Sequence, residues 1–265
     1  MKQINARVIE NNQFYYGKRP PGERVLLGFQ FIRLSCPEME KPEPGQFVMI
    51  NCGEECSLPR PFSVHQANDD EISLWIAVWE DGKGAGWLAE RKPGDTLELL
   101  APLGNSYSIT PKSKILLLAG GVGIAPLYFL AQEVIAKKCS VTMIHGASDK
   151  LNLYPQEMPG DIELITATDN GSAGYHGPVT DLIPDYVNKT DGIFACGPEA
   201  MYRVMAKTPE LKGKRVEVSL ETRMGCGRGI CYSCTVRTNR GVKQACEDGP
   251  IFNLDEIIWD ELTNC

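Results

Sequence analysis

The apolar residues of this chain follow two patterns, and the change from one to the other falls near residue 114. Between residue 5 and about residue 103, short apolar stretches are separated by turn signals such as Pro44-Gly45 and Pro93-Gly94. Several short strands at this spacing indicate an antiparallel barrel or sandwich. The stretches that predict strands are 24–33, 46–51, 72–78 and 96–100, and residues 86–91 predict one helix.

The second pattern begins with Ile115 to Ala119, a continuous apolar run that glycines follow. Such a run is typical of a parallel strand that is buried on both faces. Further strands are predicted at 141–145, 162–167 and 192–195, and helices at 126–138 and 199–206; after residue 218 the chain becomes rich in Cys and Gly. Strands that alternate with helices indicate a doubly wound α/β domain with a parallel sheet. We therefore predict a β + α/β protein with a β-barrel domain (1–105), an α/β domain (106–215) and a small cysteine-rich domain (216–265).

The composition is that of an ordinary globular protein, with 265 residues of which 43% are hydrophobic and 23% charged. A net charge of −7 argues against nucleic acid or an anionic membrane surface as a partner. The apolar runs are too short for a membrane span, and polar residues interrupt any core of signal-peptide type near the start. We expect a cytoplasmic protein, in which the ten cysteines do not form structural disulfides.

Four cysteines are clustered toward the end of the chain, with the spacing Cys226-x4-Cys231-x2-Cys234-x11-Cys246. Three ligands from one tight loop and a fourth from further along match the plant-type arrangement for a [2Fe–2S] cluster. A zinc site is the alternative, but zinc motifs usually contain two C-x2-C pairs and only one is present here. The spacing therefore favours the iron–sulfur cluster. The remaining cysteines are scattered, and most should be small buried residues: Cys36, Cys52, Cys56, Cys139, Cys196 and Cys265.

Two loops of the α/β domain are candidates for binding a dinucleotide. Gly120-Gly121-Val122-Gly123 follows the first buried strand and precedes a helix, where glycines let the backbone approach a phosphate. Cys196-Gly197 follows the strand at 192–195, and its small thiol side chain would leave room beside a nicotinamide ring. Each loop alone could equally be a tight turn without a ligand. Together they favour a nucleotide site at the carboxyl ends of the strands.

Arg60-Pro61-Phe62-Ser63 in the first domain is a candidate flavin segment. A buried arginine can neutralise a diphosphate, and an extended Pro-x-Ser segment can lie along an isoalloxazine ring. These four residues alone are also compatible with an ordinary strand that carries a surface arginine. The three histidines form no recognisable catalytic set, so we predict no acid–base catalytic residue.

In this order, the barrel segment and the two loops resemble the ferredoxin–NADP reductase superfamily. The resemblance implies that Arg60 to Ser63 contact FAD, that the glycine-rich turn binds a pyridine nucleotide, and that Cys196-Gly197 lies beside the nicotinamide. Adding the cysteine cluster makes the whole chain similar to the electron-transfer subunits of type B dihydroorotate dehydrogenases. The segments that carry this second similarity are 103–107, 167–171, 226–234 and 246–252.

The second resemblance implies a subunit that carries FAD and [2Fe–2S] and exchanges a hydride with NAD(H). Its expected partner is an FMN-containing catalytic subunit that interconverts dihydroorotate and orotate, in a heterotetramer with two copies of each subunit. The residues expected to bind the FAD and nucleotide are Arg60, Pro61, Phe62, Ser63, Ala77, Val78, Trp79, Gly84, Ala85, Gly120, Gly121, Gly123, Cys196 and Gly197. Those expected to bind the cluster are Cys226, Cys231, Cys234 and Cys246.

The chain departs from this pattern in places. Gly84-Ala85 stands where the family has Gly-Thr, so that a hydroxyl contact to the flavin is missing, and Cys52 and Cys56 have no assigned role. Asp149 follows the strand at 141–145 and would repel the 2′-phosphate of NADP, which favours NAD, although Lys150 beside it weakens this argument.

Three other functions stay open from the residues alone. The chain could be the iron–sulfur flavoprotein subunit of another complex, such as a bifurcating transhydrogenase or a cytoplasmic hydrogenase. It could also be a stand-alone NAD(P)H–acceptor reductase. In a reading without enzymatic activity, the four clustered cysteines hold zinc and the chain senses nucleotides.

Overall fold

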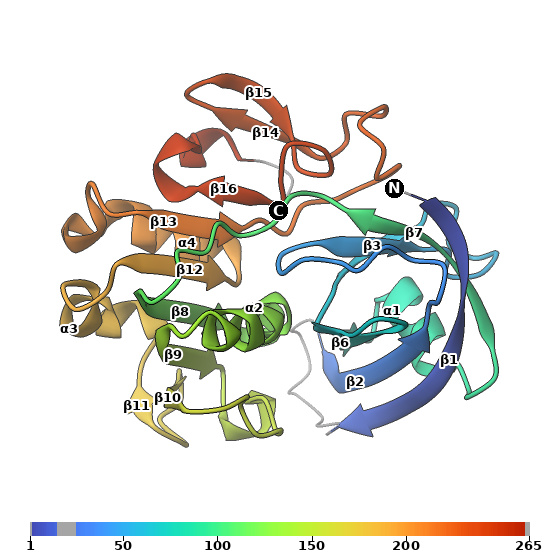
Figure 1. Ribbon diagram of the computed structural model, residues 1–265, viewed down its shortest axis with the longest axis horizontal. Coiled ribbons are helices and arrows are strands. Elements are labelled where there is room, and N and C mark those ends of the chain that lie inside the picture. Colours follow the sequence, from blue (N-terminus) through green and yellow to red (C-terminus); the bar gives the residue numbers. More distant parts are fainter. Residues whose placement is uncertain (1, 15–24, 263–265) are drawn as a thin grey trace.

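The computed structural model describes residues 2–14 and 25–262, and Arg24 and Cys265, which belong to the predictions above, lie outside this part. The first domain is an antiparallel seven-stranded sheet in the order β4-β3-β7-β1-β2-β6-β5. It is curled around one core, as the barrel prediction requires (Figure 1). Its elements are β1 (Lys2–Phe14), β2 (Leu26–Ser35), β3 (Phe47–Ile50), β4 (Arg60–Ser63), β5 (Gln66–Ala67), β6 (Glu71–Trp79), α1 (Lys83–Ala89) and β7 (Thr96–Leu103).

The long strand β1 has no counterpart in the predicted elements. Only alternate residues of its first half are buried, and Ile4, Ala6 and Val8 are each at most 4% exposed while the residues between them face solvent. Successive side chains of a strand point to opposite faces, so such a strand presents a single apolar face to the core. The polar residues in between hide the strand from a search for apolar runs.

The second domain is built on a sheet in the order β11-β10-β9-β8-β12-β13-β16, which is parallel except for the edge strand β16. After β8 the chain adds β9 to β11 on one side and then returns to add β12 and β13 on the other. Ligands bind at such a reversal of strand order, outside the carboxyl ends of the strands. The elements are β8 (Lys114–Gly120), α2 (Ile124–Ala136), β9 (Ser140–Ala147), β10 (Ile162–Thr168), β11 (Tyr175–His176), α3 (Ile183–Val187), β12 (Gly192–Cys196), α4 (Glu199–Lys207) and β13 (Val216–Ser219).

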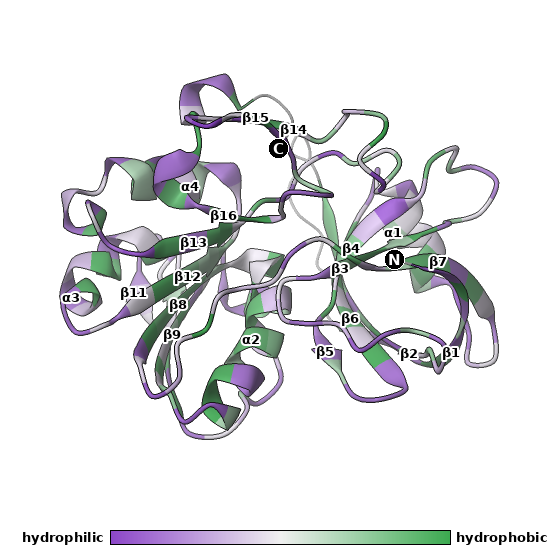
Figure 2. Ribbon diagram, turned by 45° about the horizontal axis from the view of Figure 1, so that its top comes forward, coloured by the Kyte–Doolittle hydropathy of each residue, from purple (hydrophilic) through white to green (hydrophobic). Residues whose placement is uncertain are grey.

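The central strands of this sheet carry the apolar core of the domain. Ile115, Leu116, Leu117 and Leu118 of β8 are at most 1% exposed, as the continuous apolar run predicts. Figure 2 shows these strands as a hydrophobic layer between more polar outer segments. Among the described residues, no helix combines the length and the apolar character that crossing a membrane requires.

The strands after residue 215 belong to two different sheets. β14 (Thr235–Thr238) and β15 (Gly241–Gln244) form a separate two-stranded hairpin, whereas β13 and β16 (Ile251–Asn253) belong to the α/β sheet. The hairpin and the loop before it lie over the junction of the other two domains (Figure 1). Single-turn 3₁₀ helices complete the fold: Gly121–Gly123, Lys150–Asn152, Val179–Leu182, Pro209–Leu211, Leu254–Glu256 and Trp259–Glu261.

Candidate cofactor and cluster sites

Two adjoining cavities lie between the barrel and the α/β sheet. The large cavity has a volume of about 850 Å³ and is lined by both loops at the carboxyl ends of β8 and β12. The small cavity has a volume of about 280 Å³ and is lined by β4, β6 and the segment after β13. The walls shared by the two cavities are Ala77, Trp79, Val122 and Glu221. Ligands in the two cavities would therefore meet at these four residues.

The barrel contributes β4 and β6 to the small cavity. Pro61, Phe62 and Ser63 line it, and Ala77 and Trp79 line both cavities. Val78 lies between the last two and points the other way, into the barrel core, where it is 3% exposed. The strand period of two explains this difference, because the predicted segment 77–79 can present only alternate side chains to one ligand.

Arg60 is directed toward helix α1 and not toward the small cavity. A Cβ built on Gly84 would lie 2.6 Å from Cγ of Arg60, so this glycine makes room for the arginine stem. The Arg60 guanidinium donates to the Leu58 carbonyl at 2.7 Å. Ala85 packs against the barrel core. Arg60 and Gly84, which the sequence analysis expected to bind the same cofactor, therefore lie in contact with each other.

The three glycines of the β8 turn have different surroundings. Gly120 and Gly121 line the large cavity, as does Gly197 of the second loop. Gly121 adopts φ +54, and no atom lies within 4 Å of where its Cβ would be. Gly123 does not line the cavity but packs against the second loop, and a Cβ there would lie 2.8 Å from the Gly197 nitrogen. One glycine is therefore open to a ligand, while another allows the two loops to touch.

Cys196 is 1% exposed and does not line the large cavity. Burial raises the pKa of its thiol well above the usual value, and the hydroxyls of Tyr202 and Ser219 lie beside it. Tyr202 also connects the loops, since its hydroxyl accepts from the Gly197 nitrogen at 2.8 Å and donates to the Ser219 carbonyl at 2.6 Å. The part of this loop that reaches the cavity is Gly197, and the Cys196 thiol lies behind it.

The acidic residue that sequence reasoning named for the choice between NAD and NADP does not line the large cavity. The Asp149 carboxylate accepts from the Leu151 and Asn152 nitrogens at 2.9 and 3.2 Å and so caps a 3₁₀ turn. Three other carboxylates line the large cavity: Asp169 directly after β10, Glu199 at the start of α4, and Glu221. Among the described residues that line this cavity, none is lysine or arginine. This electrostatic setting offers no counter-charge to a 2′-phosphate, in agreement with NAD.

Sequence reasoning missed the segment between β13 and the cysteine loop. Ser219, Leu220, Glu221, Thr222 and Met224 all line the small cavity. The Thr222 hydroxyl is buried there without a hydrogen-bond partner. Their position in the sequence is a signal for such a role. They directly follow a parallel strand, and ligands bind at the carboxyl ends of parallel strands. The apolar walls together with an unpartnered hydroxyl fit a flat ring that has a polar edge, such as isoalloxazine.

The cysteine loop directs backbone N–H groups at its thiol sulfurs. The Arg228 nitrogen donates to Cys226 Sγ and the Gly229 nitrogen to Cys246 Sγ, both at 3.3 Å. Gly227 and Gly229 adopt φ +64 and +67, the left-handed conformation that glycine allows without strain. N–H groups that point at thiolate sulfurs tune iron–sulfur clusters, so this arrangement fits the predicted group.

The four thiols differ in exposure, and two of them have shifted pKa values. Hydrogen bonding to Ser233 lowers the pKa of the exposed Cys231 to about 6, whereas burial raises that of Cys246 to about 12. Within the described residues, no three His, Cys, Asp or Glu side chains are grouped for a metal ion. The four cysteines nonetheless lie within reach of one another, since Cys226 is a neighbour of both Cys231 and Cys246, and Cys234 is a neighbour of Cys246.

The cysteine loop packs directly on the barrel. A Cβ on Gly227 would lie 2.6 Å from Cγ of Met49, and Met49 of β3 pairs with Pro61 of β4. Neighbouring strands are roughly 4.8 Å apart, so the loop lies about one strand from the candidate flavin segment. Met224, two residues before Cys226, lines the small cavity itself. The cluster site and the small cavity are therefore adjacent.

The scattered cysteines behave largely as predicted. Cys36, Cys52 and Cys196 are each 1% exposed, and the Cys52 thiol donates to the Ile50 carbonyl at 3.4 Å. Burial raises the pKa of Cys52 to about 12, which makes it an unreactive packing residue. Cys56 packs against the same barrel core. Packing therefore accounts for the two cysteines that had no assigned role.

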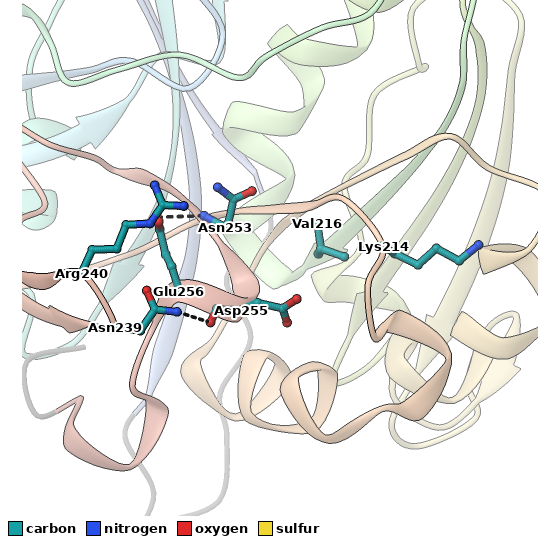
Figure 3. A pocket seen from close by; sticks show the side chains of 7 residues that line it. All are labelled: Lys214, Val216, Asn239, Arg240, Asn253, Asp255 and Glu256. Carbon is teal, nitrogen blue, oxygen red and sulfur yellow. Dashed lines mark hydrogen bonds between the residues drawn. The ribbon is translucent and has the colours of Figure 1, made fainter.

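A further pocket of about 230 Å³ lies away from these sites, between the end of the α/β sheet and the hairpin (Figure 3). Its charged lining residues are of both signs, namely Lys214, Arg240, Asp255 and Glu256. Two hydrogen bonds hold its wall: Asn239 donates to the Asp255 carbonyl at 3.3 Å, and the Asn253 nitrogen to Glu256 at 3.1 Å (Figure 3). It contains none of the residues predicted to bind a cofactor.

Comparison with known proteins agrees with this arrangement. Residues 221–258 match the iron–sulfur cluster binding domain of dihydroorotate dehydrogenase B, and residues 117–207 match the oxidoreductase NAD-binding domain. The dihydroorotate dehydrogenase B (NAD(+)) electron transfer subunit of Desulforamulus reducens is 38% identical over 87% of this chain and 92% of its own length. The chain belongs to this family. The corresponding subunit of Caldanaerobacter subterraneus is 34% identical, over 97% of this chain and 99% of its own length.

Solved structures give the same fold for this family member. An NADH-dependent reduced ferredoxin–NADP oxidoreductase, described for flavin-based electron bifurcation, aligns with a TM-score of 0.81 and 29% identity over 97% of this chain and 90% of that one. A ferredoxin reductase of carbazole 1,9a-dioxygenase shares the fold with a TM-score of 0.65 at 20% identity, over 81% of this chain and 66% of that one. The protein is thus an NAD-linked oxidoreductase of the electron-transfer type, whose cofactors are FAD, a [2Fe–2S] cluster and NAD(H).

Proposed function

We propose that this subunit passes electrons between NAD(H), FAD and the [2Fe–2S] cluster, to or from an FMN-containing dihydroorotate dehydrogenase catalytic subunit. The observation that carries the proposal is the contiguity of the three sites. The large and small cavities share four wall residues, and the small cavity is lined by Met224, two residues before the first cluster cysteine. Electrons that enter at the nucleotide can therefore leave at the cluster without crossing the protein core.

The nucleotide would lie in the large cavity, on the backbone of Gly120, Gly121 and Gly197. Glycines at these positions let the diphosphate approach the main chain. Asp169, Ser148 and Asn152 at the end of β9 and β10 would face the adenosine half. Val122 and Glu221 stand at the border of the small cavity, which is where the nicotinamide would meet the flavin.

The flavin ring would lie in the small cavity, along Pro61, Phe62 and Ser63 on one side and Ala77 and Trp79 on another. Arg60, held beside Gly84 at the start of α1, would neutralise the diphosphate of FAD. When bound, FAD exchanges a hydride with NAD(H) and single electrons with the cluster. The chain's own residues bind, orient and exclude water, and none of them has to act as an acid or base in the hydride step.

The cluster would be held by Cys226, Cys231, Cys234 and Cys246, with N–H groups of residues 228 and 229 directed at its ligands. The loop around it is exposed and apolar, since Ile230 and Tyr232 are 73% and 64% exposed. Leu58 of the barrel, 51% exposed, lies beside Gly225 and extends this surface. Large apolar side chains gathered in the open mark an interaction site, and we assign it to the partner flavoprotein.

By its family we further propose a heterotetramer with two copies of each subunit, in the cytoplasm. The nine cysteines that the structure describes are all free thiols, which fits a reducing compartment. Charge supports a protein partner, since the net charge of −7 disfavours nucleic acid and anionic membrane surfaces.

Purification from cells at native expression level, followed by identification of the bound proteins, tests this assignment. A dihydroorotate dehydrogenase catalytic subunit in the complex, together with NADH-dependent reduction of orotate, is the expected result. A hydrogenase or transhydrogenase subunit in its place would overturn the partner and leave the cofactors intact. Full turnover of the isolated chain with a soluble acceptor would instead favour a stand-alone reductase.

A subunit of a bifurcating transhydrogenase is the second candidate. It is favoured by the match over 97% of the chain to a structure described for flavin-based electron bifurcation. The match to that structure is 29% identical, against 38% for the Desulforamulus reducens subunit, so we place it second.

A further inference from the structure

The hydroxyl of Thr222 is buried and has no hydrogen-bond partner. Thr222 is 7% exposed, and its Oγ1 is among the few buried side-chain oxygens and nitrogens of the described residues that make no hydrogen bond. Buried hydroxyls in folded proteins are almost always paired, so an unpaired one calls for an explanation. Thr222 lines the small cavity, which places this group where a ligand can reach it.

The walls around Thr222 leave few polar atoms to satisfy it. The small cavity is lined mainly by apolar side chains, namely Pro61, Phe62, Trp75, Ile76, Ala77, Trp79, Val122, Ala125, Pro126, Leu220, Met224 and Pro250. Its other polar side chains are Ser63, Ser219 and Glu221. An apolar slot with one unpaired hydroxyl is complementary to a flat heteroaromatic ring that carries nitrogen or oxygen atoms on one edge.

We propose that the Thr222 hydroxyl forms a hydrogen bond with a nitrogen or oxygen on the polar edge of the isoalloxazine ring. The proposal rests on the assignment of FAD to the small cavity. The benzenoid edge of the ring offers no hydrogen-bonding atom, so the polar edge faces Thr222. Thr222 is then a positioning residue, which holds the ring against the segment that leads through Met224 to Cys226.

This assignment explains why the segment after β13 enters the flavin cavity at all. Ser219 is the last residue of β13, and Cys226 is the first cluster ligand, so the residues between them join the nucleotide sheet to the cluster loop. A hydrogen bond from the middle of this segment fixes the distance between ring and cluster loop. None of the described residues that line the small cavity belongs to the cluster loop 225–234, so this hydrogen bond would act from outside that loop.

Replacement of the hydroxyl by a methyl group of the same shape tests the proposal. FAD is removed from the purified protein, and the dissociation constant for added FAD is measured by flavin fluorescence, together with the absorption spectrum and midpoint potential of the bound flavin. Loss of one hydrogen bond should weaken FAD binding about tenfold in Thr222→Val. Thr222→Ser keeps the hydroxyl and should stay within about twofold of the unaltered protein.

Thr238→Val serves as the matched control, because Thr238 is also buried but its hydroxyl donates to the Gly241 carbonyl at 2.7 Å, in the hairpin. This control should bind FAD normally. Equal FAD affinity, spectrum and potential in Thr222→Val and the unaltered protein would overturn the proposal. If Thr222→Val does not fold, FAD affinity is compared between Thr222→Ala and Thr222→Ser instead. Equal affinity in these two variants would overturn the proposal. Failure of the unaltered protein to bind FAD would refute the proposed function instead.

Discussion

The carbonyl group of Cys196 lies against the α-carbon of Gly123, with no room between them for a side chain. A Cβ on Gly120 would likewise lie 2.7 Å from Cδ of Pro198. Two of the three glycines in the turn after β8 are therefore required by contact with the loop after β12. The shape of the large cavity depends on this contact, because both loops form its walls.

Replacing Gly123 by alanine should separate the two loops and distort the nucleotide site. We expect a loss of about 1–3 kcal/mol in the free energy of unfolding, as for other overpacked positions, and at least tenfold weaker binding of NADH. Thermal unfolding and calorimetric titration measure the two effects. Gly86→Ala is the matched control, since nothing lies within 4 Å of its Cβ position. If both variants behave alike, the contact with Cys196 has no role in shaping the site.

The central strands of the α/β sheet could be predicted because their signals are local, whereas β1, with its alternating apolar and polar residues, was missed. The apolar run Ile115 to Ala119 is a central strand, and the glycines after it form the turn at the sheet's ligand-binding edge. The direction in which individual side chains point, and hence which of them face a ligand, was not predictable in the same way. Val78 turns into the barrel core, and the Cys196 thiol lies behind Gly197, because tertiary packing decides which side of a strand or loop faces a ligand.

Glu221 and Thr222 escaped sequence reasoning for a different reason. Neither belongs to a motif, and they reach the small cavity because β13 ends opposite the barrel strand β6, more than a hundred residues earlier in the chain. Such a meeting of distant segments leaves no periodic trace in the sequence. The predicted boundary at residue 216 likewise follows a change in composition, while β13 and β16 join the α/β sheet.

Glu221 should make the binding of the oxidised nucleotide depend on pH. It lies where the two cavities meet, and although its side chain also reaches solvent, desolvation by the surrounding protein raises the pKa of its carboxyl to about 6. The carboxylate present above this pH attracts the cationic nicotinamide of NAD⁺, whereas the neutral ring of NADH gains nothing. The affinity for NAD⁺ should therefore fall as the pH drops through about 6, while that for NADH stays constant.

Equilibrium binding of NAD⁺ and of NADH, measured from about pH 5 to about pH 8, tests this prediction. In Glu221→Gln the pH dependence for NAD⁺ should disappear, and NADH should bind as before. Asp185→Asn, at a solvent-facing carboxylate of α3, is the control. An unchanged pH profile in Glu221→Gln would assign the dependence to another group.

His65 should make the protein less stable in acid. It is fully buried, with Nδ1 3.0 Å from the Ser73 hydroxyl and Nε2 2.8 Å from the Tyr154 hydroxyl, and it stacks on Tyr128 of α2. Burial lowers the pKa of His65 to about 3. Above the unfolded-state pKa of about 6.5 both states are neutral, and below it only the unfolded chain takes up the proton.

The stability that His65 contributes is therefore lost as the pH falls from about 6.5 toward 3, by up to about 1.4 kcal/mol per pH unit. Thermal unfolding of His65→Gln between neutral pH and pH of about 4.5 should show a smaller loss than the unaltered protein. His176→Gln, at an exposed histidine of β11, should keep the full loss. Equal slopes for all three proteins would show that His65 is not responsible.

The exposed apolar side chains near the cluster loop should be needed for association with the partner subunit but not for retention of the cluster. Ile230→Ser combined with Tyr232→Ser removes two large exposed side chains beside Cys231, and we expect at least tenfold weaker association with the catalytic subunit. Leu164→Ser, at a residue 44% exposed on β10, is the control. Surface plasmon resonance measures affinity, and visible absorption verifies that the cluster is retained. Normal affinity of the double variant would place the interface elsewhere.

Cys231 separates the two halves of the proposed electron path. It is the exposed cysteine of the cluster loop, and neither the large nor the small cavity is lined by it. Cys231→Ser should abolish electron transfer to the partner and alter the spectrum of the cluster. Anaerobic reduction of FAD by NADH should continue at nearly the normal rate, since its site is intact.

Stopped-flow absorption at flavin wavelengths follows the first step, and orotate-dependent oxidation of NADH in the complex follows the second. Cys139→Ser is the control, because the Cys139 thiol donates to the Thr110 carbonyl at 3.4 Å, a bond that serine can keep. Both steps should be normal in this control. Loss of both steps in Cys231→Ser would mean that the flavin depends on the cluster loop for its own reduction, because that loop packs on Met49 of β3, which pairs with β4.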